Sequence, residues 1–154
     1  FVQGILGIGQ VLATAVIHAV KEAARKDMPL TIIDCPPGTS CPVIESVRDA
    51  DFVLLVTEPT PFGLHDLKLA VAMLKALGKP FAVAVNRYDA GDEGVAMYCH
   101  EEAIETLLTL PDDRKIAEAY SRGELLLEAL PPYRSFFSHL LVKLLSAGQK
   151  EAAR

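Results

Sequence analysis

Stretches of uninterrupted apolar residues alternate along this chain with stretches in which apolar residues recur every three or four positions. The uninterrupted stretches are too apolar for strands that face water on one side, so they predict strands inside a parallel sheet. We expect four such strands, at residues 30–34, 51–57, 81–86 and 105–111. The periodic stretches predict amphipathic helices. These are expected at residues 10–26, 42–50, 63–77, 95–103, 112–122 and 133–147.

Inward-facing residues and glycines support two of these helices. Gly78 follows helix 63–77 where a left-handed C-cap glycine is common, and Gly123 is expected to end helix 112–122. Ile116 and Tyr120 share one face of helix 112–122 and are expected to point inward. The stretch 125–132 is ambiguous. The inward residues expected on helix 63–77 are Leu67, Val71 and Leu74.

Strands that alternate with helices predict an α/β fold, with a parallel sheet and helices on both faces. The chain has 154 residues, which suits one compact domain with a sizeable core. We expect residues 1–147 to belong to that domain and residues 148–154 to form a frayed tail.

Composition and charge exclude several classes of protein. The net charge of −5 argues against nucleic acid as the main partner. Charged residues or prolines interrupt every apolar run before the roughly 18 residues that a membrane span needs. The three cysteines form no paired framework, which is typical of a reducing cytoplasm. Cys35 and Cys41 are expected to have packing roles, with a redox or metal role as the weaker alternative, and Cys99 is expected in the core.

Polar and backbone-shaping residues follow each of the four expected strands. Ligands of open parallel sheets bind beyond the carboxyl ends of the strands, so these residues are the candidates for a binding site. They are Asp34, Pro37, Gly38 and Thr39 after the first strand, Glu58, Pro59 and Thr60 after the second, Asn86 and Arg87 after the third, and Pro111, Asp112 and Asp113 after the fourth.

Asp34 has the chemistry of an outer-sphere Mg²⁺ partner, because a carboxylate at a strand tip can hold a metal-bound water. The prolines that follow supply no N–H donors, whereas Gly38 offers a backbone N–H that a phosphate can approach closely. The equally weighted alternative is an aspartate that caps an ordinary turn. Asn86 can read a base edge or simply form a turn, and Asp112 or Asp113 can cap the following helix.

Three longer stretches together resemble the MinD/ParA/Mrp class of deviant P-loop ATPases, in the branch that carries an inserted ferredoxin domain. These stretches are DCPPGTSCPVIESVRDADFVLLVTEPTPFGLHDLKLAV at residues 34–71, VAVNRYD at 83–89 and LPDDRKIAEAYSRGELLLEALPPY at 110–133. Asp112 departs from the family pattern, which has an aromatic residue there. The resemblance runs from about residue 30 to residue 133.

The resemblance implies a role for each strand-end segment. Asp34 and Gly38 would belong to the second switch, beside Mg²⁺ and the γ-phosphate of ATP. Asn86 would touch the adenine, and Pro111 and Asp113 would form the loop over the base. The loop with Glu58 and its neighbours would lie beside the nucleotide or a dimer face, because family members commonly sandwich ATP between two subunits and change their affinity for a client protein on hydrolysis.

The same resemblance implies that part of the family fold is missing here. No G-x-x-x-x-G-K-S/T run and no four-cysteine cluster occurs in the chain. We therefore expect a partial P-loop fold without its first strand and phosphate loop, and an iron–sulfur cluster only in the missing insert. The parent protein would be an ATPase, whereas this chain alone should bind ATP weakly and hardly hydrolyse it. The alternative is a non-catalytic α/β binding or dimerisation module. In either case a bare sheet edge predicts self-association.

Overall fold

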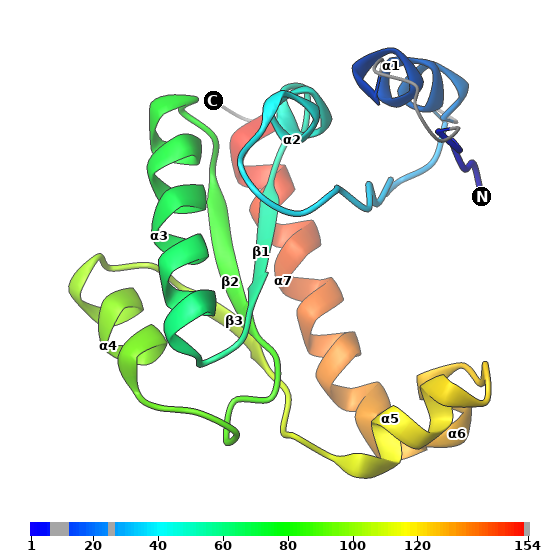
Figure 1. The fold of residues 1–154 in the computed structure, drawn as a ribbon. Helices are drawn as coiled ribbons and strands as arrows, with labels where there is room; N and C mark the ends of the chain where they lie inside the picture. Colours follow the sequence, from blue (N-terminus) through cyan, green and yellow to red (C-terminus); the bar gives the residue numbers. More distant parts are fainter. Residues whose placement is uncertain (7–12, 25–26, 153–154) are drawn as a thin grey trace.

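A three-stranded parallel sheet forms the centre of the molecule (Figure 1). The structure is a computed structural model that describes residues 1–6, 13–24 and 27–152. The strands lie side by side in the order β1-β2-β3. Val53 pairs with Phe81 at the start of β1, and Val85 pairs with Thr109 at the end of β2. The strands are β1 (Val53–Thr57), β2 (Phe81–Val85) and β3 (Thr106–Thr109).

Helices alternate with these strands along the chain, as expected for an α/β fold. The helices are α1 (Ala13–Ala23), α2 (Cys41–Val47), α3 (Pro61–Ala76), α4 (Gly94–Glu101), α5 (Arg114–Ser121), α6 (Leu126–Ala129), the short 3-10 helix η1 (Pro131–Tyr133) and α7 (Arg134–Ala152). None of the helices in the described ranges combines the length and the apolar character that crossing a bilayer requires.

Successive side chains of β2 point to opposite faces of the sheet, and different helices cover the two faces. Val83 and Val85 pack into a cluster with Leu67 of α3 and Cys99 of α4. On the opposite face, Ala84 packs with Leu108 of β3 and Leu140 of α7, and Phe137 and Leu144 pack against this second cluster. Helices therefore cover both faces of the parallel sheet, as the sequence predicted, and Cys99 lies in the core.

The prediction of a strand at residues 30–34 is wrong. These residues lead from α1 to α2 without pairing with any described strand, and β1 pairs only with β2. Ile32 is 81% exposed although its stretch is apolar. An apolar run indicates burial, but a strand also needs a neighbour for its backbone hydrogen bonds, and none of the described strands lies beside this segment.

The predicted helices and the three remaining strands are confirmed, with shifted ends. Gly78 and Gly123 have φ angles of +63° and +70°, so both end their helices in the left-handed conformation. The expected burial of Tyr120 is wrong, because its side chain is 84% exposed. Ala119 shares a helix face with Ile116 as Tyr120 does, and the structure buries this smaller side chain.

The C-terminal segments differ from expectation in extent. The ambiguous stretch 125–132 becomes α6 followed by η1. Helix α7 runs to Ala152, past the predicted end near residue 147, and residues 10–12 and 25–26 of the first predicted helix lie outside the described residues.

Candidate functional site

The carboxyl ends of all three strands meet at one end of the sheet, at the bottom in Figure 1. Parallel pairing forces this arrangement, because the strands point the same way. The loops that follow them carry the sequence-predicted residues from Glu58 to Asp113.

Glu58, Asn86 and Arg87 join the ends of β1 and β2. The backbone N–H of Asn86 donates to the carbonyl of Thr57 at 2.8 Å, which continues the strand pairing by one residue. The Asn86 side-chain amide donates to the Glu58 carboxylate over 3.5 Å, and Arg87 Nη1 lies 3.6 Å from the other carboxylate oxygen. Asn86 and Arg87, both predicted from the end of one strand, therefore share the carboxylate of Glu58, which was predicted from the end of another.

Arg87 also reaches the end of β3. Its Nε donates to Asp112 Oδ1 at 2.9 Å and its Nη2 to Asp112 Oδ2 at 3.4 Å, a two-point pairing. The hydrogen bond to Asp112, followed by the charges of Asp112 and Glu58, raises the pKa of Arg87. The φ of Arg87 is +53°, an uncommon left-handed value for a residue with a long side chain. This strained residue links all three strand ends.

Two glycines allow the loops after β1 and β2 to lie in contact. A Cβ on Gly91 would stand 1.6 Å from the carbonyl oxygen of Pro59, and that oxygen accepts a hydrogen bond from Asp92 N–H at 3.0 Å. A Cβ on Gly63 would stand 2.2 Å from the Glu58 carbonyl oxygen. Thr60 caps α3 by accepting from Gly63 N–H at 3.0 Å. These close approaches fix where Glu58 and Pro59 lie.

A hollow of about 370 Å³ opens at the end of β1. We call it the strand-end hollow. Its walls come from the end of β1, the start of α3 and the end of β2, and its polar groups include two carboxylates, two hydroxyls and one amide. The lining residues are Val56, Thr57, Glu58, Thr60, Gly63, Asp66 and Asn86.

Asp113 caps helix α5 at the end of β3. Its Oδ1 accepts from Lys115 N–H and its Oδ2 accepts from the Tyr133 hydroxyl, each at 2.9 Å. The backbone hydrogen bond from Lys115, followed by that from Tyr133, lowers the pKa of Asp113. The predicted capping role is confirmed for Asp113, and both of its carboxylate oxygens are occupied by protein donors.

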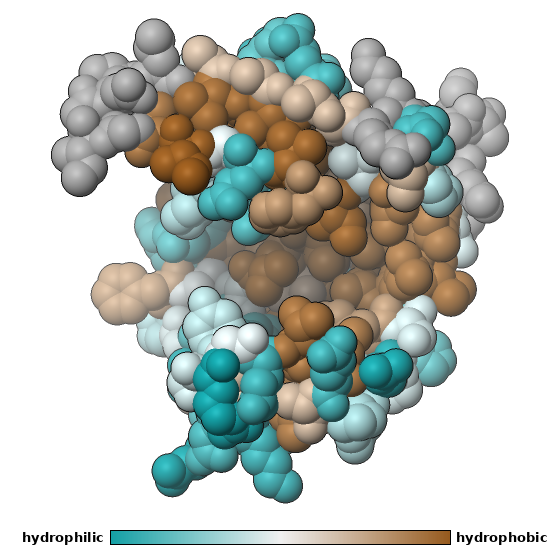
Figure 2. Space-filling model, turned by 90° about the vertical axis from the view of Figure 1, so that its right-hand side faces the viewer, coloured by the Kyte–Doolittle hydropathy of each residue, from teal (hydrophilic) through white to brown (hydrophobic). Residues whose placement is uncertain are grey.

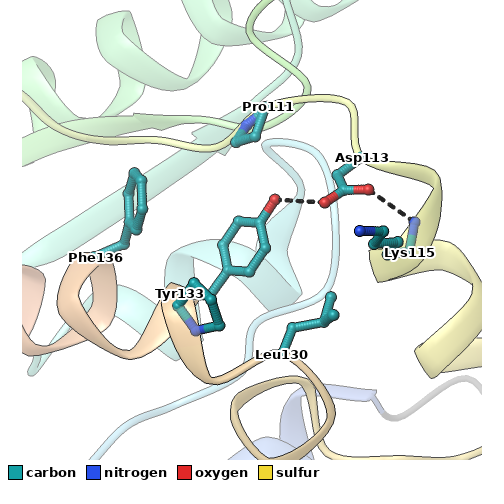
Figure 3. Close-up of a pocket in the computed structure, with 7 residues that line it drawn as sticks. Pro111, Asp113, Lys115, Leu130, Tyr133 and Phe136 are labelled. Carbon is teal, nitrogen blue, oxygen red and sulfur yellow. Dashed lines mark hydrogen bonds between the residues drawn. The ribbon is translucent and has the colours of Figure 1, made fainter.

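A second cavity, of about 330 Å³, lies beside Asp113 and is drawn in Figure 3. We call it the aromatic pocket. It sits between the loop after β3, η1 and the first turn of α7, and most of its lining is apolar. The lining residues are Pro111, Asp113, Lys115, Leu130, Pro132, Tyr133 and Phe136.

The segment around Asp34 is not joined to these loops. Asp34, Pro37 and Gly38 are exposed, and Thr39 is half-buried. Gly38 has a φ of +92°, which only glycine adopts without strain. The described hydrogen bonds and ion pairs do not connect residues 34–39 to Glu58, Asn86 or the loop after β3. The structure thus brings together Glu58, Asn86, Arg87 and Pro111 with Asp113, and leaves Asp34 and Gly38 on a separate segment.

The residues present fit a magnesium–nucleotide complex only in part. Among the described residues, no three His, Cys, Asp or Glu side chains are grouped so as to hold a metal ion. Mg²⁺ keeps several waters and commonly takes only one or two protein carboxylates, so the exposed Asp34 carboxylate has suitable chemistry for an outer-sphere contact. Cys35, Cys41 and Cys99 are free thiols, and burial raises the pKa of Cys35.

Sequence reasoning missed several residues of this region. It placed Tyr133 and Phe136 only in the apolar stripe of the last predicted helix, gave Lys115 no role, and did not pair Asp112 with Arg87. Tyr133 lies 20 residues from Asp113 along the chain, so no local pattern reveals their hydrogen bond. The Pro-Pro-Tyr run at the start of the last predicted helix was the available signal, because two prolines restrict the backbone just before the aromatic ring.

Comparisons with known proteins identify relatives of the chain. It is 33% identical over 112 residues to an uncharacterised protein of Methanocaldococcus jannaschii, covering 73% of this chain and 38% of that protein. It is 26% identical over 160 residues to the iron–sulfur cluster carrier protein of Pyrococcus horikoshii, covering 94% of this chain and 54% of the carrier. No family model matches the chain.

The fold matches that of the MinD cell division protein of Aquifex aeolicus, with a TM-score of 0.61 and 17% identity over 92% of this chain and 60% of that one. The chain is a distant relative of the MinD/ParA/Mrp-type P-loop NTPases. The chain spans only 31–54% of the length of the curated relatives it matches.

Proposed function

We propose that this chain forms the base side of an ATP-binding site and contributes its second switch segment. In this arrangement Glu58, Asn86 and Pro111 face the adenosine part of the nucleotide. Asp34 and Gly38 belong to the mobile phosphate side of the site, and they approach the nucleotide only when ATP and Mg²⁺ are bound. The parent protein is then an ATPase.

The convergence of three strand ends supports this proposal most directly. Asn86 and Arg87, which follow β2, meet Glu58 after β1 within hydrogen-bonding or ion-pairing distance at the carboxyl end of a parallel sheet, and Arg87 also pairs with Asp112 after β3. That is where open α/β sheets bind ligands. Asn86 offers a donor and an acceptor for a base edge, and its present contact with Glu58 is long at 3.5 Å, so a ligand can replace it at small cost.

The phosphate side rests on the chemistry of the segment around Asp34. Asp34 is exposed and has no described hydrogen bond, so its carboxylate is free to accept one from a metal-bound water. Gly38 at φ +92° has no side chain beside its backbone N–H, and the space around it is open, since a Cβ there would meet nothing within 4 Å. Thr39 and Pro37 flank this turn, and Pro59 and Arg87 hold the opposite loops in place.

A non-catalytic binding or dimerisation module is the second candidate, and exposed apolar surface favours it. Figure 2 shows apolar side chains around a hollow on the side of the molecule on which α1, α5 and α6 lie in Figure 1. Ile32, Val56 and Phe62 are 81%, 69% and 86% exposed. Monomeric proteins seldom expose large contiguous apolar patches unless the patch binds a partner.

Titration with Mg-ATP tests the first candidate. Nuclear magnetic resonance suits the weak affinity expected of this 154-residue chain. We expect Mg-ATP to shift the resonances of Asn86, Glu58 and Gly38, and the variants Asn86→Ala and Glu58→Gln to weaken binding about tenfold. Glu102→Gln is the matched control, because Glu102 pairs with Lys75 between α3 and α4. Unchanged ATP affinity in Asn86→Ala would overturn the proposal and leave the binding module as the better account.

A further inference from the structure

Helix α1 has little burial of its own and depends on its contact with α2. None of its residues from Ala13 to Ala23 is buried, and α2 is the element against which it packs. Figure 1 shows α1 apart from the three strands and beside α2. An isolated helix of 11 residues is marginal in water. The polar contacts between α1 and α2 therefore matter for where α1 lies.

Lys21 joins α1 to α2 through two hydrogen bonds. Its ammonium group donates to the backbone carbonyl of Glu45 and to Asp49 Oδ2, each at 2.8 Å. The Lys21 side chain is only 16% exposed, so protein covers most of its alkyl stem. The carbonyl of Glu45 belongs to the last turn of α2, where the helix dipole favours a cation. We call Lys21 with its two acceptors the Lys21 clamp.

A second lysine fixes the same end of α2 to the part of the fold that carries the sheet. Lys79 lies just before β2, and its ammonium group donates to the carbonyl of Ala50 at 3.0 Å. Val43 and Val47 of α2 are buried. Helix α2 is thus anchored independently of α1, and the Lys21 clamp ties α1 to an anchored element.

The segment around Asp34 lies in the chain between the two clamped helices. Lys21 and Asp49 are 28 positions apart, and both Asp34 and Gly38 fall between them. Closing such a loop removes many conformations of the enclosed chain. Cys35 also follows α2: burial raises the pKa of its thiol, and a hydrogen bond with a serine of α2 partly offsets that rise. The position of Asp34 is therefore coupled to the clamp.

We propose that Lys21 is a positioning residue of the phosphate side, whose clamp holds the connection between α1 and α2 so that Asp34 and Gly38 reach a magnesium-bound phosphate. This inference rests on the proposed function and adds a residue that does not touch the nucleotide. With both ends of the connection fixed, the approach is confined to the turn at Gly38, whose φ of +92° only glycine adopts without strain. A restricted segment loses less conformational entropy on binding.

Titrations of the full chain with Mg-ATP and with metal-free ADP, which lacks the metal and the γ-phosphate, test this assignment. Lys21→Met keeps the alkyl stem and removes both hydrogen bonds. We expect it to weaken Mg-ATP about 2- to 10-fold and to leave ADP affinity unchanged. Lys21→Arg should restore most of the Mg-ATP affinity, because a guanidinium also donates to a carboxylate and a carbonyl. Lys75→Met is the matched control, since Lys75 also joins two helices, through Glu102.

Spectra of the ligand-free chain give a readout that does not depend on nucleotide binding. Lys21→Met should shift the amide resonances of Asp34 and Gly38, leave that of Asn86 in place, and speed hydrogen exchange in α1 about tenfold. Asp49→Ala removes one acceptor of the clamp and alters a side chain that is 71% exposed, so it should fold even where Lys21→Met does not. It should produce the same changes in spectra and in Mg-ATP affinity, with smaller size.

Failure of this inference differs from failure of the proposed function. If Lys21→Met speeds exchange in α1 but leaves the resonances of Asp34 and Gly38 in place, the clamp holds only α1 and the inference is overturned. If it weakens Mg-ATP and ADP equally, the effect is general destabilisation, and the positioning role is overturned while the nucleotide site stands. If the unsubstituted chain binds no Mg-ATP at millimolar concentration, the proposed function is overturned and the phosphate role of Lys21 with it.

Discussion

At the scale of single residues, Asp113 combines two tasks that are usually separate. It caps α5 through Lys115 N–H and holds the ring of Tyr133, 20 residues further along the chain. Capping by an aspartate could be predicted from the sequence because the cap and its helix are adjacent. The tyrosine contact could not, because it depends on how η1 folds back onto the loop after β3.

The charge of Asp113 should contribute to thermal stability at neutral pH, and this contribution should be lost in acid. Its pKa is lowered in the folded state by the hydrogen bonds from Lys115 and Tyr133. A lowered pKa means that the charge stabilises the fold above the ordinary aspartate pKa, and that this contribution is lost as pH falls through the folded-state pKa. We expect Asp113→Asn, which still caps a helix, to melt about 2–4 °C lower at pH 7.

Thermal melts from pH 7 down to pH 2 measure this effect. The difference between the unsubstituted chain and Asp113→Asn should shrink toward zero at the acid end. Tyr133→Phe should reproduce part of the loss at pH 7, because it removes one of the two donors to Asp113. A difference that is constant with pH would mean that the Asp113 charge contributes nothing and that only the side-chain geometry matters.

At the scale of elements, close backbone contact between loops positions the candidate site. Pro59 and Gly91 belong to different loops, and a side chain on Gly91 would collide with the Pro59 carbonyl. We expect Gly91→Ala to lower the free energy of unfolding by about 1–3 kcal/mol, because the loops after β1 and β2 must move apart. It should also shift the amide resonances of Glu58 and Asn86, which those loops carry.

Gly123→Ala is the comparison variant, because it introduces backbone strain without a steric collision of the new side chain. Gly123 has a φ of +70° and open space where a Cβ would lie. Alanine there should cost about 1 kcal/mol of strain in α5's C-cap and should leave the strand-end resonances in place. Urea unfolding of both variants gives the stabilities. Identical resonances at Glu58 in Gly91→Ala would show that the loops do not need their observed contact.

The elements also show where sequence patterns suffice and where they fail. The runs at 51–57 and 81–86 were predicted correctly because each becomes a strand with a described neighbour. The run at 30–34 has the same apolar pattern and becomes a connection without regular secondary structure instead. Hydrophobicity reports a preference for burial, whereas strand formation needs a pairing partner, which no local window of sequence contains. The same limit explains why Asp34 could not be placed relative to Asn86.

At the scale of the whole molecule, the outer edge of β1 is the feature that remains to be explained. Among the described strands β1 pairs only with β2, so its other backbone edge is unpaired. Val56 near the end of this strand is 69% exposed, and Leu30, Ile32 and Ile33 are exposed as well. An unpaired apolar edge is a template for another strand, and soluble proteins usually protect it with charge.

We therefore expect the chain to self-associate through β1, and a charge on that edge to prevent it. Sedimentation velocity over a range of concentrations should show a rising sedimentation coefficient for the unsubstituted chain. Val56→Lys should remove the rise, because a lysine on an edge strand opposes pairing with a second copy. Val142→Lys is the matched control, since Val142 is 64% exposed but belongs to helix α7 and not to the edge strand. A monomer at every concentration, or equal association by both lysine variants, would rule out pairing through β1 and leave the exposed edge without a role in self-association.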